Sequence, residues 1–476
     1  MAATTPTSAR AAGPAPAATK RLGLPQYLGY ASGDAANNLA FSMSSLFLLL
    51  YYTDVAGISA AAVGTMFLVV RFWDALTDLF AGRLVDRAQT RWGKFRPFIL
   101  FGAVPLLLMS VAVFSIPNGL HGTSGALVWA YITYALLGLL YSLVNIPYGS
   151  LAAAMTQAPT ERARLATWRV YGSNLTILML AFVVAPQIKS SSNLQRSLTI
   201  TTLAFVVLGA TLYLLTFFTA REQVQRDVPQ VSLRQSFATL KTNRPLIMLC
   251  VSSLLFLTGM IAVSTVGAFY ARDVLGNANL FIYMTLLQTV GTFAIAVFIP
   301  KIVRTLGKKQ GYLLLGLVAT VAGVGIMFAP PSVPAIALFF FFVLGIGVGG
   351  VNTLMWALEA DTVEYGEWKT GVRTEGITYA LFSFTRKMGQ ALGGSAAAFT
   401  LGLGGYLAGK GVVQSESAKT AIKVAAGLLP AGFIVLALVI MLFYPLTERV
   451  FRDVVAEVAA RRAQRIAEAV ESAPGA

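Results

Sequence analysis

The sequence predicts an all-α membrane protein of twelve transmembrane helices arranged in two six-helix halves, and three observations support this. Of the 476 residues, 56% are hydrophobic and 12% are charged, and the mean hydropathy is +0.70, whereas soluble domains carry about 25% charged residues. Apolar stretches of about 20 residues recur, each long enough to cross a hydrocarbon layer as a helix. The longest polar link, residues 220–244, divides these stretches six and six.

The two halves are expected at residues 26–219 and 245–446, joined by a cytoplasmic linker at 220–244. The first 20 residues are rich in Ala, Pro and Thr and lack the apolar stretch of a signal peptide, so residues 1–25 are expected to form a disordered tail. The helices are expected, in chain order, at 31–53, 57–82, 95–116, 126–150, 163–186, 197–219, 245–271, 278–303, 311–329, 333–358, 375–406 and 421–445.

The C-terminal tail, 447–476, spaces Val450, Val454 and Val458 four residues apart, with several arginines following. This pattern predicts an amphipathic cytoplasmic helix, which either rests on the membrane surface or is simply solvated.

Basic residues predict the orientation. Loops 53–59, 115–125 and 329–334 contain no Lys or Arg, whereas the alternate segments contain many. The positive-inside rule therefore places both termini in the cytoplasm, with the lysines of loop 404–423 as an exception. The segments predicted as cytoplasmic are 86–97, 160–164, 220–244, 301–309 and the C-terminal tail. Because the net charge of +16 is scattered over these loops, we expect a lipid bilayer as its partner and no nucleic acid.

The expected helix 57–82 carries three ionisable residues, Arg71, Asp74 and Asp78. Their spacing of three and four places them on one helix face, where each charge costs roughly 2.5–3.5 kcal/mol near the bilayer centre. Short Asp side chains do not reach water from the expected depth of about 6–16 Å. Two neighbouring carboxylates also repel each other and raise each other's pKa unless a cation lies between them. We therefore predict that Asp74 and Asp78 bind one monovalent cation, H⁺ or Na⁺, with Arg71 as a charge partner and Thr77 as a further oxygen ligand.

Polar residues occur at comparable depth in several other expected helices. An intramembrane asparagine often only joins helices, and an arginine near a helix end often anchors it, but together these residues predict a polar cavity between the halves. An intramembrane lysine such as Lys387 indicates function by default. The residues are Asn37, Asn38, Ser142, Asn145, Arg169 and Lys387.

Four groups of motifs resemble the glycoside–pentoside–hexuronide:cation symporter family, a branch of the major-facilitator fold. They are YYTDVAGIS (51–59), RFWDALTD with TRWGKFRPF (71–78 and 90–98), YSLVNIPYGSL (141–151) and ADTVEYGEWKTGVRTEG (360–376). The resemblance covers about residues 26–446, and segments 155–165, 239–250 and 356–367 are most similar to the glucuronide-carrying members. It implies sugar–cation symport by alternating access across a bacterial cytoplasmic (inner) membrane, with no enzymatic activity and no cofactor beyond the coupling ion.

Position by position, the resemblance implies that Asp74 and Asp78 hold the coupling ion. Thr77 and Ser142 match the polar neighbours of this ion. Arg169 and Lys387 match basic residues at the sugar and coupling site.

The resemblance also implies a substrate. Galactoside carriers of the family have aspartates at the positions matched to Asn38 and Asn145, and an aromatic residue where this chain has Gly149. Asparagines keep hydrogen bonds without charge, and Arg169 or Lys387 can bind a carboxylate. We therefore predict a β-glucuronide, bound by these four residues together with Asn37. A neutral glycoside or a pentoside is the alternative.

Two inner segments, 86–97 and 361–373, carry charges of both signs at equivalent places in the two halves. They are expected to pair across the cytoplasmic face when the carrier opens outward and to separate when it opens inward. The alternative is that they only anchor the topology. The expected gate residues are Asp86, Arg87, Arg91, Lys94, Arg96, Asp361, Glu364, Glu367 and Arg373.

Two other functions are compatible with parts of this pattern. An intramembrane prenyltransferase would hold Mg²⁺ on the DxxxD pair, but it needs a second acidic cluster, and the only candidate, Asp361 with Glu364 and Glu367, is expected in a loop. A channel or a cation-independent facilitator would share the fold without accumulating sugar. The sequence does not choose between H⁺ and Na⁺, because an aspartate pair suits either ion.

Overall fold

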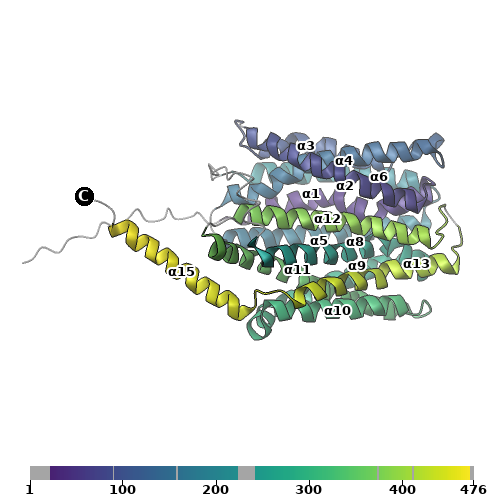
Figure 1. The fold of residues 1–476 in the computed structure, drawn as a ribbon. Coiled ribbons are helices and arrows are strands. Elements are labelled where there is room, and N and C mark those ends of the chain that lie inside the picture. The colour runs from purple at the N-terminus through teal and green to yellow at the C-terminus, as the bar shows by residue number, and fades with distance from the viewer. Residues whose placement is uncertain are drawn as a thin grey trace, which may run out of the picture.

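A computed structural model describes residues 22–88, 90–156, 159–222, 242–371, 375–409 and 412–471, and these are mostly helical. Long helices lie side by side in one bundle, and the last helix leaves the bundle at one end (Figure 1). The N-terminal half consists of α1 (Leu24–Leu50), α2 (Ala60–Arg87), α3 (Arg96–Val113), α4 (Ser124–Met155), α5 (Pro159–Ser190) and α6 (Leu194–Thr219).

The C-terminal half repeats this plan. It consists of α8 (Arg244–Phe269), α9 (Leu280–Leu306), α10 (Lys308–Phe328), α11 (Pro334–Thr370), α12 (Glu375–Leu403) and α13 (Glu416–Ala426), which α14 (Leu428–Leu442) continues; α15 (Glu448–Glu471) follows. We call the bundle end where α1 begins and α14 ends the inner face, and the opposite end the outer face. The prediction that the inner face is cytoplasmic stays a prediction.

Ten of the described helical segments are long and apolar enough to cross a membrane, with α13 and α14 counted as one. The other two bundle helices, α1 and α12, fall outside this set and carry polar residues such as Asp34 and Lys387. Both pack inside the bundle, α1 against α5, α6 and α8, and α12 against α2 and α8. The predicted count of twelve spans requires that these two polar helices also cross.

Short polar residues begin several helices. The side chains of Ser59, Thr123, Asn193 and Asn243 each accept a hydrogen bond from a backbone N–H in the first turn of α2, α4, α6 and α8. Such caps satisfy donors that have no partner inside the helix. Prolines stand in the first turn of α1, α3, α8 and α11, where a missing N–H costs nothing.

Both halves end their first helix in the same way. A five-residue π-helical turn follows α1 at Tyr51–Val55 and follows α8 at Tyr270–Val274. The sequences are YYTDV and YARDV, and a glycine with positive φ comes two residues after each turn, Gly57 at +72° and Gly276 at +71°. The two halves are therefore related by an internal repeat that includes local backbone geometry.

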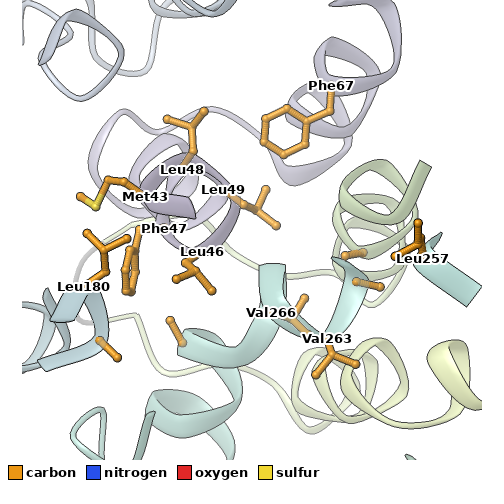
Figure 2. Close-up of a cluster of buried hydrophobic side chains, with 14 of the residues drawn as sticks. Met43, Leu46, Phe47, Leu48, Leu49, Phe67, Leu180, Leu257, Val263 and Val266 are labelled. Carbon is orange, nitrogen blue, oxygen red and sulfur yellow. The ribbon is translucent and has the colours of Figure 1, made fainter. Parts of the chain in front are cut away.

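A cluster of buried apolar side chains lies inside the bundle, and it contains residues of both halves. Figure 2 shows Leu46 of α1 on the side that faces Val266 and Val263 of α8, and all three are buried. Within the C-terminal half, α12 approaches α8 closely through glycines: a Cβ added at Gly389 or Gly393 would lie 2.4 Å from an α8 carbonyl oxygen. Small residues at such crossings are typical of packed membrane helices.

Most helix ends lie a few residues from the expected positions; α1, for example, begins at Leu24 rather than 31 and so overlaps the expected tail 1–25. Three further differences concern charged residues or the continuity of a helix. Helix α2 continues to Arg87 rather than ending at 82, and α11 continues to Thr370 rather than 358. Hydropathy identifies the lipid-embedded part of a helix and not its polar last turns, so Asp361, Glu364 and Glu367 belong to a helix and their placement in a loop was wrong. The expected helix 421–445 is two helices separated at Gly427, because Pro430 lacks the N–H that would continue one ladder.

Helix α15 contacts the inner end of α11. Trp368 Nε1 donates a hydrogen bond to Glu457 at 2.7 Å, and Arg461 Nη1 donates one to the Trp368 carbonyl at 2.9 Å. Val454 and Val458 are buried, whereas Val450 is 39% exposed. Two of the three valines of the predicted apolar stripe are thus covered by the protein.

Candidate transport site

The charged residues of α2 face α4 and α12. Asp78 Oδ1 accepts a hydrogen bond from Ser142 Oγ at 2.7 Å, and Asp78 Oδ2 accepts one from Lys387 Nζ at 2.5 Å. Because α2 belongs to one half and α12 to the other, the Asp78–Lys387 pair joins the halves. With α2 ending at Arg87, Asp78 and Asp74 lie about 14 Å and 20 Å along the helix from its inner end, and their side chains are 23% and 20% exposed.

Asp74 is held by its own helix and by α4. Arg71 Nη1 donates to Asp74 Oδ2 at 2.9 Å, and Arg71 Nη2 donates to the Tyr134 hydroxyl at 3.1 Å. The other oxygen, Asp74 Oδ1, is buried and accepts no hydrogen bond from the described residues. A Cβ at Gly138 would lie 2.1 Å from that oxygen. The glycine thus gives the carboxylate its room.

Two further side-chain oxygens are candidate cation ligands, that of Thr77 on α2 and that of Asn145 on α4. Thr77 Oγ1 donates to the Asp74 carbonyl at 3.0 Å, which leaves its lone pairs for a cation. Asn145 follows Ser142 by three residues, so both lie on one face of α4. The Asn145 Oδ1 atom is buried and receives no hydrogen bond within the described structure. Oxygens of this kind are the ligands that hard cations prefer.

A second ion pair lies within the N-terminal half. Arg169 Nε of α5 donates to Asp34 Oδ1 of α1 at 2.7 Å, and the Arg169 guanidinium carbon lies 5.4 Å from the centre of the Tyr148 ring. Asn38 Nδ2 donates to the Asp34 carbonyl at 2.8 Å and to Asp34 Oδ2 at 3.2 Å, and Asn38 Oδ1 accepts from Ser42. The Asp34 side chain is 7% exposed and that of Arg169 is 37% exposed.

Asp34 is the residue of this candidate site that sequence reasoning overlooked. It stands four residues before Asn38 and therefore on the same helix face. The argument that this helix offers hydrogen bonds without charge is incomplete, because the Asp34 carboxylate is present and is neutralised by Arg169. A carboxylate one turn from the polar Asn37–Asn38 pair was the signal that could have found it.

Asn37 is placed differently from the other predicted residues. Its Oδ1 atom accepts a hydrogen bond from the Tyr213 hydroxyl of α6 at 2.8 Å, and the residue is 1% exposed. Asn37 therefore contacts α6, and its proposed contact with substrate stays a prediction.

The two groups of charges are linked through α4, where Ser142 donates to Asp78 and the Tyr148 ring lies 5.4 Å from the Arg169 guanidinium carbon. Helices α1, α2, α4, α5 and α12 thus contribute to one layer. It contains three carboxylates, Asp34, Asp74 and Asp78, and three cationic groups, Arg71, Arg169 and Lys387. With these six groups ionised, their charges sum to zero; Arg386, next to Lys387 on α12, instead donates to Asn352 of α11 at 2.8 Å. The described residues contain no group of three or more His, Cys, Asp or Glu side chains able to hold a metal ion.

The expected gate residues with described contacts bind within their own halves or, for Lys94, to Glu222 at the start of the linker. Arg96 donates to the Phe217 carbonyl at 2.6 Å through Nη2, and the Arg91 guanidinium carbon lies 4.4 Å from the Trp92 ring centre. The backbone N–H of Lys94 donates to Glu222 at 2.9 Å, and Lys308 donates to Asp361 at 2.6 Å.

The remaining gate residues divide into two groups. Glu364 and Glu367 stand on α11. Arg373 and the side chains of Asp86 and Arg87 lie outside the described part of the molecule. The cytoplasmic gate stays a prediction.

The sequence is similar to proteins that move solutes across membranes. Residues 29–448 match the family model described as MFS/sugar transport protein. The chain is 50% identical over 439 residues to the glucuronide carrier protein homolog of Escherichia coli (strain K12), covering 91% of this chain and 95% of that one. It is 33% identical over 425 residues to the isoprimeverose transporter of Lactiplantibacillus pentosus, covering 87% of each.

Solved structures agree on the fold. The nucleoside transporter NupG superposes with a TM-score of 0.61 at 13% identity, covering 89% of this chain and all of that one. A bacterial homologue of the iron transporter ferroportin in an inward-facing state gives 0.61 at 16% identity, covering 88% of this chain and 97% of that one. Identities this low establish the shared architecture alone.

Proposed function

Because the chain belongs to the MFS/sugar transport protein family, we propose that it imports β-glucuronides across a bacterial inner membrane in symport with one monovalent cation. Its relatives and structural neighbours are transporters, which removes the prenyltransferase alternative. The observation that carries the proposal is the Lys387–Asp78 pair, which joins a candidate substrate group of one half to the candidate cation site of the other.

The charge of the layer favours an acidic cargo. Adding one cation at Asp74 and Asp78 changes the summed charge of the six groups in the layer from zero to +1. A glucuronide carries one negative charge and restores neutrality, whereas a neutral glycoside leaves an uncompensated charge inside the membrane, which is costly. An acidic sugar and a cation therefore stabilise each other in this site.

Lys387 supplies a physical link between the two ligands. A cation on the carboxylate pair competes with the Lys387 ammonium group for Asp78 and releases that group to bind the sugar carboxylate. Bound sugar in turn holds Lys387 away from Asp78 and raises the affinity for the cation. The two affinities change by the same factor, as linkage requires, and the loaded halves then rock about the site.

The similarity to the glucuronide carrier homolog supports this cargo. The isoprimeverose transporter, at 33% identity, supports a different sugar on the same scaffold as the alternative.

Uptake into proteoliposomes tests the proposal. Labelled glucuronide and a neutral glycoside with the same aglycone are supplied under an imposed H⁺ gradient and, separately, under an imposed Na⁺ gradient. We expect the glucuronide to accumulate above equilibrium with one of the two gradients. Equilibration without accumulation would indicate a facilitator, and accumulation of the neutral glycoside alone would refute the acidic cargo.

Replacing Lys387 tests whether this residue couples cation binding to sugar binding. Lys387→Gln is expected to lower glucuronide uptake at sub-saturating concentration by about tenfold to a hundredfold, because a hydrogen bond to a charged group contributes about 1.5–3 kcal/mol. The loss should appear mainly in KM and be smaller for a neutral glycoside. Lys419→Gln, on a lysine paired with Glu416 in the outer loop region, is the matched control. Normal glucuronide uptake by Lys387→Gln would end the carboxylate assignment.

A further inference from the structure

A buried ionic cluster joins the two halves at the outer face. Arg272 Nη1 donates to Asp54 Oδ2. Arg272 also donates to both oxygens of Asp273 at 2.8 Å and to the Tyr406 hydroxyl at 2.7 Å. The Tyr406 hydroxyl donates to Asp54 Oδ1 at 2.9 Å. The substrate and cation sites do not include these residues.

The cluster is shielded from solvent. The Asp54 side chain is 2% exposed and the Arg272 side chain 26%. Phe269 packs at right angles to Tyr406, 5.3 Å between ring centres, and the Arg272 guanidinium lies 5.7 Å from the Phe269 ring centre. Burial raises the pKa of Tyr406, so its hydroxyl stays protonated and remains a donor to Asp54. A charge this well buried depends on its partners.

Asp54 is the member that crosses the boundary. It belongs to the turn after α1, whereas Arg272, Asp273 and Tyr406 all belong to the C-terminal half. When the halves part here, Arg272 keeps Asp273 and Tyr406, and Asp54 keeps the hydroxyl of Thr53, which donates to it at 2.9 Å. Within this cluster, separation therefore breaks the two bonds from Arg272 and Tyr406 to Asp54 and leaves each charged group with a partner in its own half.

Other contacts between the halves lie on the same side of the charged layer. A Cβ at Gly64 of α2 would lie 3.1 Å from the Ala398 Cβ of α12, and one at Gly402 would lie 3.2 Å from Ala61. The Phe47 and Phe281 ring centres are 5.5 Å apart. The described structure is thus closed on its outer face.

The internal repeat shows how the cluster arises. In the turns YYTDV and YARDV, Asp54 and Asp273 occupy equivalent places, and Thr53 is the equivalent of Arg272. One half thus supplies an aspartate, and the other supplies an aspartate together with the arginine that binds both.

We propose that Asp54 and Arg272 form a latch that holds the outer face closed and sets how often the carrier exposes Asp74 and Asp78 to the outside. This inference rests on the part of the proposed function that the carrier alternates between outward-open and outward-closed states. It does not depend on which sugar or cation is carried. Weakening the latch shifts the population toward the outward-open state, by as much as the lost bonds favoured the closed one.

A cysteine placed between the latch and the charged layer measures this shift. A small cavity there is lined in part by Ser45, Arg71, Thr265 and Gln390. Ser45→Cys is made in a Cys250→Ser background, since Cys250 is the single native cysteine and is buried. A membrane-impermeant thiol reagent is then added to the outer face of right-side-out vesicles. Asp54→Asn and Arg272→Gln are expected to raise the labelling rate by about tenfold or more, as the loss of a charged hydrogen bond implies.

Asp273→Asn is the matched control. It removes one carboxylate from the same guanidinium but no bond between the halves, so its labelling rate is expected to equal or fall below that of the reporter protein. The double variant Asp54→Asn with Arg272→Gln should label no faster than either single variant. Tyr406→Phe removes the second bond to Asp54 without changing the charge and should give a smaller increase. Equal labelling of Asp54→Asn and Asp273→Asn, at matched thermal stability in detergent, would overturn the latch.

Discussion

An Asp78→Asn variant is expected to lose cation-driven accumulation and to bring sugar only to equilibrium across the membrane. The amide keeps one oxygen, which can accept from either Ser142 or Lys387, whereas the native carboxylate accepts from both through its two oxygens. The amide also carries no charge and cannot attract a cation. Losing one partner of a buried charge costs about 3–5 kcal/mol, so cation affinity should fall by about two to three and a half powers of ten.

The same substitution should leave sugar exchange in place. Lys387 is no longer held by a carboxylate and stays available to the sugar, so labelled sugar should still exchange against unlabelled sugar across the membrane without a gradient. Measuring accumulation and exchange side by side separates loss of coupling from loss of folding. Asp453→Asn, on an exposed residue of α15, serves as the control. If Asp78→Asn still accumulates sugar under an H⁺ or Na⁺ gradient, Asp78 is not the coupling residue.

Asp74 and Asp78 could be predicted from the sequence because their signal is local. Two carboxylates four residues apart inside an apolar helix are expensive wherever the helix packs, and that cost alone indicates a binding role. Lys387 was selected as a candidate by the same reasoning. Its partner was not, because the Asp78–Lys387 contact joins residues 309 positions apart, and nothing in either helix specifies which residue faces it.

The Asp54–Arg272 pair, in contrast, has no local signal in the sequence. Asp54 stands one residue beyond the helix expected at 31–53, and charged residues at membrane helix ends are ordinary. Its burial depends on an arginine 218 positions away and on a tyrosine after α12. Such residues become significant only when tertiary packing removes them from water.

An Arg169→Gln variant is expected to bind glucuronide at least about a hundredfold more weakly and to be less stable than the native chain. Arg169 is the ionic partner of Asp34, whose side chain is 7% exposed. Without Arg169 that carboxylate stays buried and unpaired, which costs about 3–5 kcal/mol. The remaining negative charge also repels an acidic sugar. Arg196→Gln, on an exposed arginine at the outer end of α6, is the matched control.

The double variant Asp34→Asn with Arg169→Gln separates the two contributions. It removes both charges and is expected to recover most of the thermal stability, because no unpaired charge is left in the helix bundle. Glucuronide binding should stay weak, since the guanidinium that could bind the carboxylate is absent, whereas binding of a neutral glycoside with the same aglycone should change less. Equilibrium binding of both sugars and thermal unfolding in detergent measure the three quantities. Full recovery of glucuronide binding in the double variant would reduce Arg169 to a structural counter-ion of Asp34 and leave Lys387 as the cationic partner proposed for the sugar.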